Sequence, residues 1–313
     1  MADLCQSANR NPLRPKSMQL LSQALQRSQA RLAAQLIPIF SLCLWCLLTI
    51  KASRSSADDG ALQLVRDSSK ADVVRDAEAF TFVRVRYEST GGYGESWYRH
   101  EGRDWDRWET DYPRGELNLL FRLNQLTSLK VNPEPIVLRL TDPAIMDHPF
   151  LFMSDVGWQF LTDREAESLA KYLSNGGFLW VDDFWGEAEW RNLARNTSKL
   201  GDHWKWRPIP PNHEILNCVY PIEACPQIPA RIFFDATGLP YDPPTVHRSP
   251  AGGVSGVRTV HFMGLFDHQG RLAAVATHNT DIADGWEREG ESEDFFEKFS
   301  IDSYAMTINI LVY

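Results

Sequence analysis

Two adjacent carboxylates, Asp182 and Asp183, end the apolar run of residues 178–181, and a third, Asp155, follows the apolar run of residues 149–153. Carboxylate oxygens bind divalent cations, and carboxyl groups also serve as general acids and bases. Side chains of neighbouring strand residues point to opposite faces, so Asp182 and Asp183 share a site only if the strand has already ended. We expect one of them to face a cleft and the other to cap the following helix.

Other polar residues also lie next to predicted strand or helix ends. The whole set of candidate ligand-binding residues is Asp111, Tyr112, Asp155, Asp182, Asp183, His213, His278, Asn279 and Asp281. If their side chains converge, carboxylates and imidazoles together form a site for a divalent cation. No HExxH motif fixes such a geometry, and each acid alone also suits a helix cap or a turn. We therefore predict no cofactor from the sequence, and a bound divalent metal ion is the alternative.

The turn after the run at residues 149–153 is the natural place for a nucleophile. The sequence there is Ser154-Asp155-Val156-Gly157-Trp158, which has no cysteine and lacks the G-x-S-x-G context for its serine. The chain also has neither a Walker loop nor a glycine-rich dinucleotide motif. We assign no catalytic residue from the sequence, and we expect no nucleotide ligand.

The segment 148–184 predicts the β-α-β unit that positions these aspartates. Thr162 and Glu165 form an S/T-x-x-E capping box, and apolar residues then follow at helical spacing. The glycine pair 176–177 ends that helix, because glycine adopts the left-handed backbone conformation at low cost. Two strands joined by a crossover helix are parallel, and ligands of such sheets bind beyond the carboxyl ends of the strands. The aspartates named above lie at that edge.

The rest of the body predicts further elements of one α/β domain over residues 80–313. The expected elements are strands at 80–87, 136–140, 262–266 and 272–277, and helices at 115–127, 187–195 and 295–313. The strands at 262–266 and 272–277 suit a β-hairpin. We find no internal repeat and no second domain boundary.

The composition of residues 88–113 predicts a long loop without secondary structure. This loop contains three tryptophans, three tyrosines and many charged residues. Loops of this length inside a domain are often functional. The mixture of aromatic and charged side chains suits a sugar- or peptide-binding surface, and a lid folded back over the sheet is the other interpretation.

Residues 1–57 form a basic leader, and residues 58–79 form a polar linker. The leader carries seven basic residues and one acidic residue, and its segment 36–50 is apolar and uncharged. Such a segment is short for a membrane-spanning helix but suits a signal peptide or an uncleaved anchor. Basic residues before it keep the N-terminus in the cytoplasm. We therefore expect an exported, periplasmic body that is either secreted through this signal or attached to the membrane by it.

The charge of the body indicates which partners it excludes, and its cysteine content bears on disulfide formation. The residues after the leader include 25 basic and 40 acidic side chains, and this negative balance argues against a nucleic-acid partner. The body has two cysteines, Cys218 and Cys225, and export favours their oxidation. Their spacing suits a disulfide, and two buried thiols are the alternative.

Several short strings of the sequence resemble one family in order and spacing. They are Thr110-Asp111-Tyr112-Pro113, Leu140-Thr141-Asp142-Pro143, His148-Pro149-Phe150-Leu151, Asn175-Gly176-Gly177-Phe178-Leu179 with Asp182-Asp183, Asn212-His213-Glu214-Ile215, His278-Asn279-Thr280-Asp281 with Gly285-Trp286, and Ile308-Asn309-Ile310-Leu311-Val312-Tyr313. Over residues 80–313 the chain resembles the bacterial domain of unknown function 4159. The resemblance implies a three-layer flavodoxin-like fold, similar to class I glutamine amidotransferases, with a mostly parallel sheet and helices on both faces. It implies no known activity, and the amidotransferase cysteine has no counterpart in the turn that begins at Ser154.

The sequence supports three hypotheses of function. The first is an exported or membrane-attached module that binds a ligand or a protein partner at the carboxyl edge of its sheet, without amidotransferase activity. The second is a metal-assisted hydrolase of a cell-wall or sugar substrate, built on the same residues. The third is a structural component of a membrane protein complex. The sequence leaves the ligand and the oligomeric state open.

Overall fold

The structure, a computed structural model, describes residues 76, 78–91, 96–100, 102–242 and 257–313. The predicted leader, with its apolar segment 36–50, lies outside the described residues, and so does most of the predicted linker. Within the described part of the chain, no helix combines the length and the apolar character that crossing a membrane requires.

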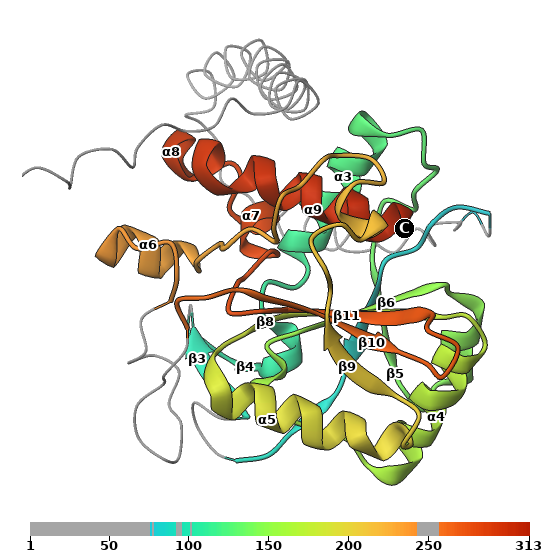
Figure 1. Ribbon diagram of the computed structural model, residues 1–313. Coiled ribbons are helices and arrows are strands. Elements are labelled where there is room, and N and C mark those ends of the chain that lie inside the picture. The colour runs from blue at the N-terminus through green and yellow to red at the C-terminus, as the bar shows by residue number, and fades with distance from the viewer. Residues whose placement is uncertain (1–75, 77, 92–95, 101, 243–256) are drawn as a thin grey trace, which may run out of the picture.

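A seven-stranded sheet runs through the centre of the described domain (Figure 1). Its strands in spatial order are β5 (Ile136–Arg139), β1 (Val83–Arg86), β6 (Phe150–Ser154), β8 (Phe178–Phe184), β11 (Leu272–His278), β10 (His261–Phe266) and β9 (Lys205–Pro208). Neighbours among the first five strands pair in parallel, whereas β10 pairs antiparallel with both β11 and β9. The predicted α/β class with a mostly parallel sheet is therefore confirmed, and the sheet is mixed because it ends in a hairpin and one more antiparallel strand.

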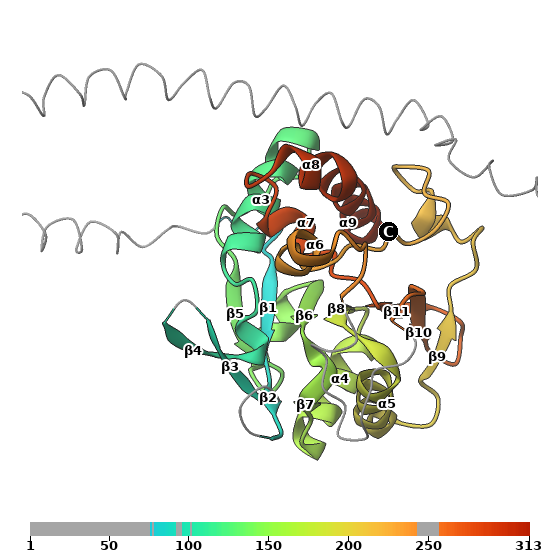
Figure 2. The same cartoon turned by 90° about the vertical axis from the view of Figure 1, so that its left-hand side faces the viewer.

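Helices cover both faces of the sheet (Figures 1 and 2). One face carries α3 (Arg114–Leu126), α7 (Asp284–Glu287), α8 (Glu293–Phe295) and α9 (Ile301–Val312), and the other carries α4 (Asp163–Ser174) and α5 (Gly186–Thr197). Alternating strand residues supply the two cores. Phe152 and Trp180 belong to the first core, and Met153 and Val181 belong to the second. A short helix, α6 (Arg231–Thr237), precedes the segment 243–256.

The predicted crossover between β6 and β8 is present with its local signals. The Thr162 hydroxyl accepts a hydrogen bond from the Glu165 N–H at 3.2 Å, and the Glu165 carboxylate accepts one from the Thr162 N–H at 2.9 Å. Gly176 has a φ of 99°, the left-handed conformation that ends α4. The parallel register then places Ser154 opposite Asp182, so both strands end at the same edge.

The prediction of a structureless loop at 88–113 was wrong. β3 (Trp97–His100) and β4 (Arg103–Asp106) form a hairpin, a 3-10 turn follows at Arg107–Glu109, and β2 (Glu88–Ser89) pairs with β7 (Gln159–Phe160). Cross-strand pairing of Tyr98 with Trp105 stabilises the hairpin, and the Arg103 guanidinium lies 3.2 Å from the centre of the Trp105 ring. The usual strand signal is absent here, because the two hairpin strands consist of aromatic, charged and histidine residues and contain no aliphatic ones.

Three smaller expectations also need correction. The first strand is shorter than predicted, and the closing helix contains a π-helical turn, Phe296–Ser300, between α8 and α9. Cys218 and Cys225 are free thiols in the structure, so the expected disulfide is not formed. The thiols have separate contacts: Cys218 Sγ lies 3.2 Å from the Asn309 carbonyl oxygen, and Cys225 Sγ lies 3.9 Å from that of Pro226.

Candidate functional site

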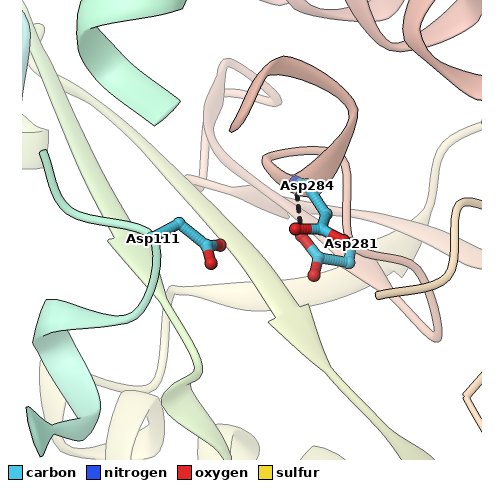
Figure 3. A group of neighbouring side chains, drawn as sticks. All are labelled: Asp111, Asp281 and Asp284. Carbon is cyan, nitrogen blue, oxygen red and sulfur yellow. Dashed lines mark hydrogen bonds between the residues drawn. The ribbon is translucent and has the colours of Figure 1, made fainter. Parts of the chain in front are cut away.

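Three aspartates from distant parts of the chain converge at the carboxyl edge of the sheet (Figure 3). Each of Asp111, Asp281 and Asp284 offers a carboxylate oxygen, and these oxygens all lie within 4.8 Å of one another. Asp111 comes from the segment before α3, Asp281 from the loop after β11, and Asp284 from the first position of α7. We call these three residues the carboxylate cluster.

The hydrogen bonds of the carboxylate cluster are incomplete. The Asp284 N–H donates to Asp281 Oδ1 at 2.8 Å (Figure 3), and the Asp284 carboxylate accepts from the Arg231 N–H. Asp111 Oδ2 is buried and has no hydrogen-bond partner. A buried carboxylate oxygen without a partner is costly, because it has lost its water and gained nothing in return. This oxygen is therefore free to bind a ligand.

Electrostatics disfavour the charged form of all three acids. Burial, followed by the charge of Asp284, raises the pKa of Asp111 to about 8. Burial also raises the pKa of Asp284 to about 6, and burial with the charge of Asp183 raises the pKa of Asp281 well above its usual range. The guanidinium groups of Arg84 and Arg288 offset part of the effect on Asp111. A divalent cation would supply the positive charge that these carboxylates lack.

Backbone strain collects at the same edge. Among the described residues, the non-glycine positions with positive φ are Asp111, Asp155, Asp183 and Asn279, at 65°, 54°, 53° and 64°. Asp and Asn tolerate this conformation better than other residues, but it still carries a cost. Asp155 directly follows β6, Asp183 lies at the end of β8, and Asn279 directly follows β11. Strained residues of this kind concentrate at functional sites.

Asp182 and Asp183 are both buried at the end of β8, but neither caps α5. Asp182 accepts from the Thr277 hydroxyl, at 2.5 Å, and from the Ala283 N–H, at 2.9 Å, so it fixes the segment that carries Asp281. Asp183 Oδ1 accepts from the Trp185 indole N–H at 3.0 Å. Burial and the charges of Asp155 and Asp111 raise the pKa of Asp183 well above its usual range. The expectation that one of the pair caps the following helix was wrong.

Asn279 and Glu189 bond to the start of α5 instead. Asn279 Oδ1 accepts from the Gly186 N–H at 2.7 Å, and the Glu189 carboxylate accepts from the Trp185 N–H at 2.6 Å. The Asn279 amide also donates to the Thr259 carbonyl oxygen at 2.7 Å. Asn279 therefore links three segments at the edge of the sheet and does not extend into the carboxylate cluster.

Asp155 anchors the segment that leads to Asp111. Its Oδ2 accepts from Arg107 Nη1 at 2.6 Å and from the Thr110 hydroxyl at 3.1 Å. The Tyr87 hydroxyl contacts the Asp155 carbonyl oxygen at 2.7 Å. Asp155 is thus not a member of the carboxylate cluster. It lies beside the cluster and holds the segment that carries Asp111.

The two histidines of the predicted set lie away from the carboxylate cluster. His278 packs on Phe184, with ring centres 4.7 Å apart, and its Nε2 hydrogen-bonds the Gly186 carbonyl oxygen at 3.0 Å. Burial lowers the pKa of His278 to about 4, so it is neutral. His213 lies 5.4 Å from the Tyr313 ring and 6.5 Å from the Phe266 ring, next to the opposite end of β10 and β11. Including His213 in the site was wrong, because the loop after β9 places it at the other end of the sheet.

A pocket of about 170 Å³ adjoins the carboxylate cluster through Asp111. Its lining residues are Tyr98, His100, Trp105, Asp111, Tyr112, Pro113, Arg114, Glu287 and Arg288. Burial, with the charges of Asp111 and Asp284, raises the pKa of Glu287 to about 10. The aromatic segment and the aspartates therefore meet at one place, and Tyr112 lies where they meet.

Asp284, Glu287 and Arg288 were not among the site residues predicted from the sequence. The available signal was the spacing of Asp281 and Asp284, three residues apart, because that spacing brings two side chains together at the first turn of a helix. No comparable sequence signal points to a contact with Asp111, since the two segments meet only through the strand order of the sheet.

No curated protein matches the chain. The family model for a domain of unknown function (DUF4159) matches residues 81–313, which include the sheet, its helices and every residue of the candidate site. The chain therefore belongs to the DUF4159 family.

Proposed function

We propose that this domain binds a divalent cation through Asp111, Asp281 and Asp284, and that the cation is the centre of a ligand-binding site at the carboxyl edge of the sheet. The carboxylate cluster carries this proposal: three acids lie within 4.8 Å of one another, and one buried oxygen has no partner. Acids that only cap or brace a fold are normally paired with donors or with basic groups. Here three acids lie against one another and Asp111 Oδ2 has no partner, so a positive group would complete the cluster.

The donor set favours a hard cation. All three candidate ligands are carboxylates, and the cluster contains neither histidine nor cysteine. Oxygen ligands suit Mg²⁺, Ca²⁺ and Mn²⁺, whereas Zn²⁺ prefers nitrogen and sulfur. We therefore expect Ca²⁺, Mg²⁺ or Mn²⁺ to bind more tightly than Zn²⁺.

The strand order supports a flavodoxin-like fold related to class I glutamine amidotransferases. Numbered by chain position, the parallel strands β5, β1, β6, β8 and β11 follow the order 2-1-3-4-5. Sheets of this order bind ligands beyond the carboxyl ends of their strands, where the carboxylate cluster lies. Amidotransferase chemistry is not part of the proposal, because Asp155 follows β6 where those enzymes carry their cysteine, and the described cysteines lie elsewhere.

A metal-assisted hydrolase of a cell-wall or sugar substrate is the second candidate function. Asp183 favours it, because this buried carboxyl lies near enough to Asp111 and Asp155 for their charges to raise its pKa. A carboxyl group that keeps its proton at neutral pH can act as a general acid beside a bound cation. Cation-dependent release of sugar from isolated cell wall, lost in Asp183→Asn, would make this candidate the leading one.

The N-terminal apolar segment supports the further proposal that the domain works outside the cytoplasm, attached to a membrane or secreted. A role as a structural part of a membrane complex is compatible with the same placement. Fractionation of cells that express the full-length chain tests this proposal. Recovery of the chain from the cytosol alone would contradict it.

Thermal unfolding of the full-length chain tests the cation site directly. The chain is stripped with chelator and then titrated with Mg²⁺, Ca²⁺, Mn²⁺ or Zn²⁺. A cation at 100 times its dissociation constant stabilises the fold by about 2.7 kcal/mol, which for a domain of this size raises the melting temperature by roughly 5 to 10 °C. Asp111→Asn should abolish the shift, because it removes a ligand charge and no hydrogen bond of Oδ2.

Asp163→Asn is the matched control, because Asp163 is 98% exposed on α4 and lies outside the site. The control should keep the full cation-induced shift. The proposal is wrong if no cation shifts the melting temperature, or if Asp111→Asn responds like Asp163→Asn.

A further inference from the structure

We infer that the pocket beside Asp111 binds an uncharged carbohydrate, held by the cation through its hydroxyl groups and by Trp105 and Tyr98 through its ring. This inference rests on the proposed cation site and extends it to a class of ligand. It is carried by the composition of the pocket, by its junction with the carboxylate cluster, and by the pairing of the charged groups around it.

The pocket and the carboxylate cluster share Asp111. Three carboxylate oxygens do not complete the coordination of a hard cation, since Ca²⁺ takes roughly six to eight oxygen ligands and Mg²⁺ about six. Positions that the protein leaves open are filled by water or by oxygens of a ligand. Neighbouring hydroxyl groups of a sugar provide two such oxygens at a fixed spacing, so a sugar can bind the cation from the side of the pocket.

Aromatic side chains of the pocket provide the second contact, with the ring of the sugar. Trp105 and Tyr98 come from the β3–β4 hairpin and line the pocket together with Tyr112. The Tyr98 hydroxyl lies 3.2 Å from the Thr110 hydroxyl, and Arg103 covers one face of Trp105, so both rings are held in place. The C–H face of a sugar ring packs on such aromatic faces, while the sugar hydroxyls remain available to polar groups.

The charges around the pocket favour a neutral ligand over an anionic one. Arg114 Nη1 and Arg288 Nη1 each lie 3.0 Å from Glu291 Oε1, and Arg288 also pairs with Glu287. Both guanidinium groups therefore already have an anionic partner in Glu291. A divalent cation among three ionised carboxylates leaves one net negative charge on the carboxylate cluster itself, which opposes phosphate or carboxylate groups that approach the cation. Paired donors and acceptors suit sugar hydroxyls, because a hydroxyl both donates and accepts hydrogen bonds.

Calorimetric titration of the full-length chain tests the inference. The chain is loaded with whichever divalent cation gives the largest thermal shift. The probes are the hexasaccharides of glucose, N-acetylglucosamine and xylose, and the anionic probe is hexagalacturonate. We expect at least one neutral hexasaccharide to bind the loaded chain and to lose binding in chelator. Trp105→Ala should weaken that binding at least tenfold while the cation-induced thermal shift stays unchanged.

Trp97→Ala is the matched control, because Trp97 lies in the same hairpin but does not line the pocket. The control should bind the sugar like the unaltered chain. If a cation binds and no neutral hexasaccharide does, the inference is wrong and the cation site stands. Tighter binding of hexagalacturonate, or equal losses in Trp97→Ala and Trp105→Ala, also overturns the inference. A chain that binds no cation overturns both proposals.

Discussion

Two clusters of buried charged residues lie close to α7, one at its start and one after its end, and they differ in the signs of charge that they contain. In the cluster after α7, Arg122 Nε pairs with Glu289 Oε2 at 2.8 Å, and the Tyr304 hydroxyl donates to the same oxygen at 3.1 Å. We call these three residues the arginine cluster. In the carboxylate cluster, acids face acids. The arginine cluster thus contains both signs of charge, and the carboxylate cluster contains one.

This difference separates a structural role from a binding role. The arginine cluster satisfies its own charges and joins α3 to α9 and to the segment after α7. The carboxylate cluster lies near two cations, and each of them already pairs with other acids. Arg288 Nε is 3.5 Å from Asp284 Oδ1, but Arg288 also pairs with Glu287 and Glu291. Arg84, whose charge acts on Asp111, pairs with Glu116. Buried charges that are compensated inside the fold stabilise it, whereas uncompensated ones require a partner from outside. The two clusters should therefore respond in opposite ways to loss of an acid.

The largest expected effect is the loss of the acid in the arginine cluster. Glu289→Gln leaves the Arg122 charge buried without its counterion, because the Arg122 side chain is only 1% exposed. Removing one partner of a buried ion pair destabilises a fold by about 3 to 5 kcal/mol. Urea unfolding of the full-length chain in chelator measures the change. An added divalent cation should not restore the lost stability.

Arg122→Met combined with Glu289→Gln provides the control for this prediction. The double variant removes both charges, so it should recover part of the stability that Glu289→Gln loses. If Glu289→Gln costs less than about 1 kcal/mol, the contrast between the two clusters fails, because exposed pairs contribute that little.

Loss of an acid from the carboxylate cluster is expected to increase the free energy of unfolding instead of lowering it. Asp111→Asn in chelator should stabilise the fold by about 2 kcal/mol at pH 8, because it removes a buried charge that other acids repel. Asn also tolerates the positive φ of this position. Urea unfolding measures the gain, and the same variant should lose its response to divalent cations. A destabilised Asp111→Asn in chelator would mean that the cluster is already compensated.

A stability–pH profile of the cation-free chain tests the same contrast without mutation. The folded-state pKa values of Asp284 and Asp111 are raised to about 6 and about 8, so the stability they contribute is present at low pH and is lost as the pH rises through these values. We expect a loss of about 1 to 2 kcal/mol between pH 6.5 and 8.5 in chelator. Saturating cation should reduce this loss, because it stabilises the ionised carboxylates of the cluster. Asp182, whose pKa burial raises to about 7, contributes to the loss in the same range and is not a proposed ligand.

His278 titrates in a separate pH range. Its folded-state pKa is lowered to about 4, so its contribution is lost as the pH falls from 6.5 towards 4. The range above pH 6.5 therefore reports on the carboxylates. A profile that stays flat from pH 6.5 to 8.5 in chelator would contradict the raised pKa values of the carboxylate cluster.

Local signals made the central β-α-β unit predictable. The capping box at Thr162 and the glycines after Asn175 act within a few residues of the chain, and the structure contains both. The same unit placed Asp155 and the Asp182-Asp183 pair at the carboxyl edge, as expected. Their roles were not predictable, because a side chain at that edge can face a ligand or a neighbouring segment. In the structure Asp155 and Asp182 hold neighbouring segments in place, and Asp183 accepts a hydrogen bond from the Trp185 indole.

The carboxylate cluster itself depends on contacts between distant segments. Asp111 and Asp281 meet because β1 lies between β5 and β6 and because α3 packs beside α7, and no sequence periodicity encodes either neighbour. His213, in contrast, was predicted as a site residue but lies elsewhere. Its residue type suits a ligand, but the long segment after β9 places it at the far end of the sheet. Residue type thus suggested the chemistry, and only the strand order determined which residues meet.

The smallest expected effect concerns the bond between Thr110 and Asp155. The Thr110 hydroxyl donates to Asp155 Oδ2 at 3.1 Å, one residue before Asp111. Thr110→Val should reduce the free energy of unfolding by about 1 kcal/mol, the usual net worth of one hydrogen bond. If Asp155 positions Asp111, the variant should also weaken cation binding severalfold in calorimetric titration. Thr127→Val removes a 2.7 Å hydroxyl bond to the Leu123 carbonyl oxygen at the far end of α3, and it should reduce stability similarly without changing cation affinity. Equal cation affinity in both variants would show that the carboxylate cluster keeps its geometry without the Asp155 anchor.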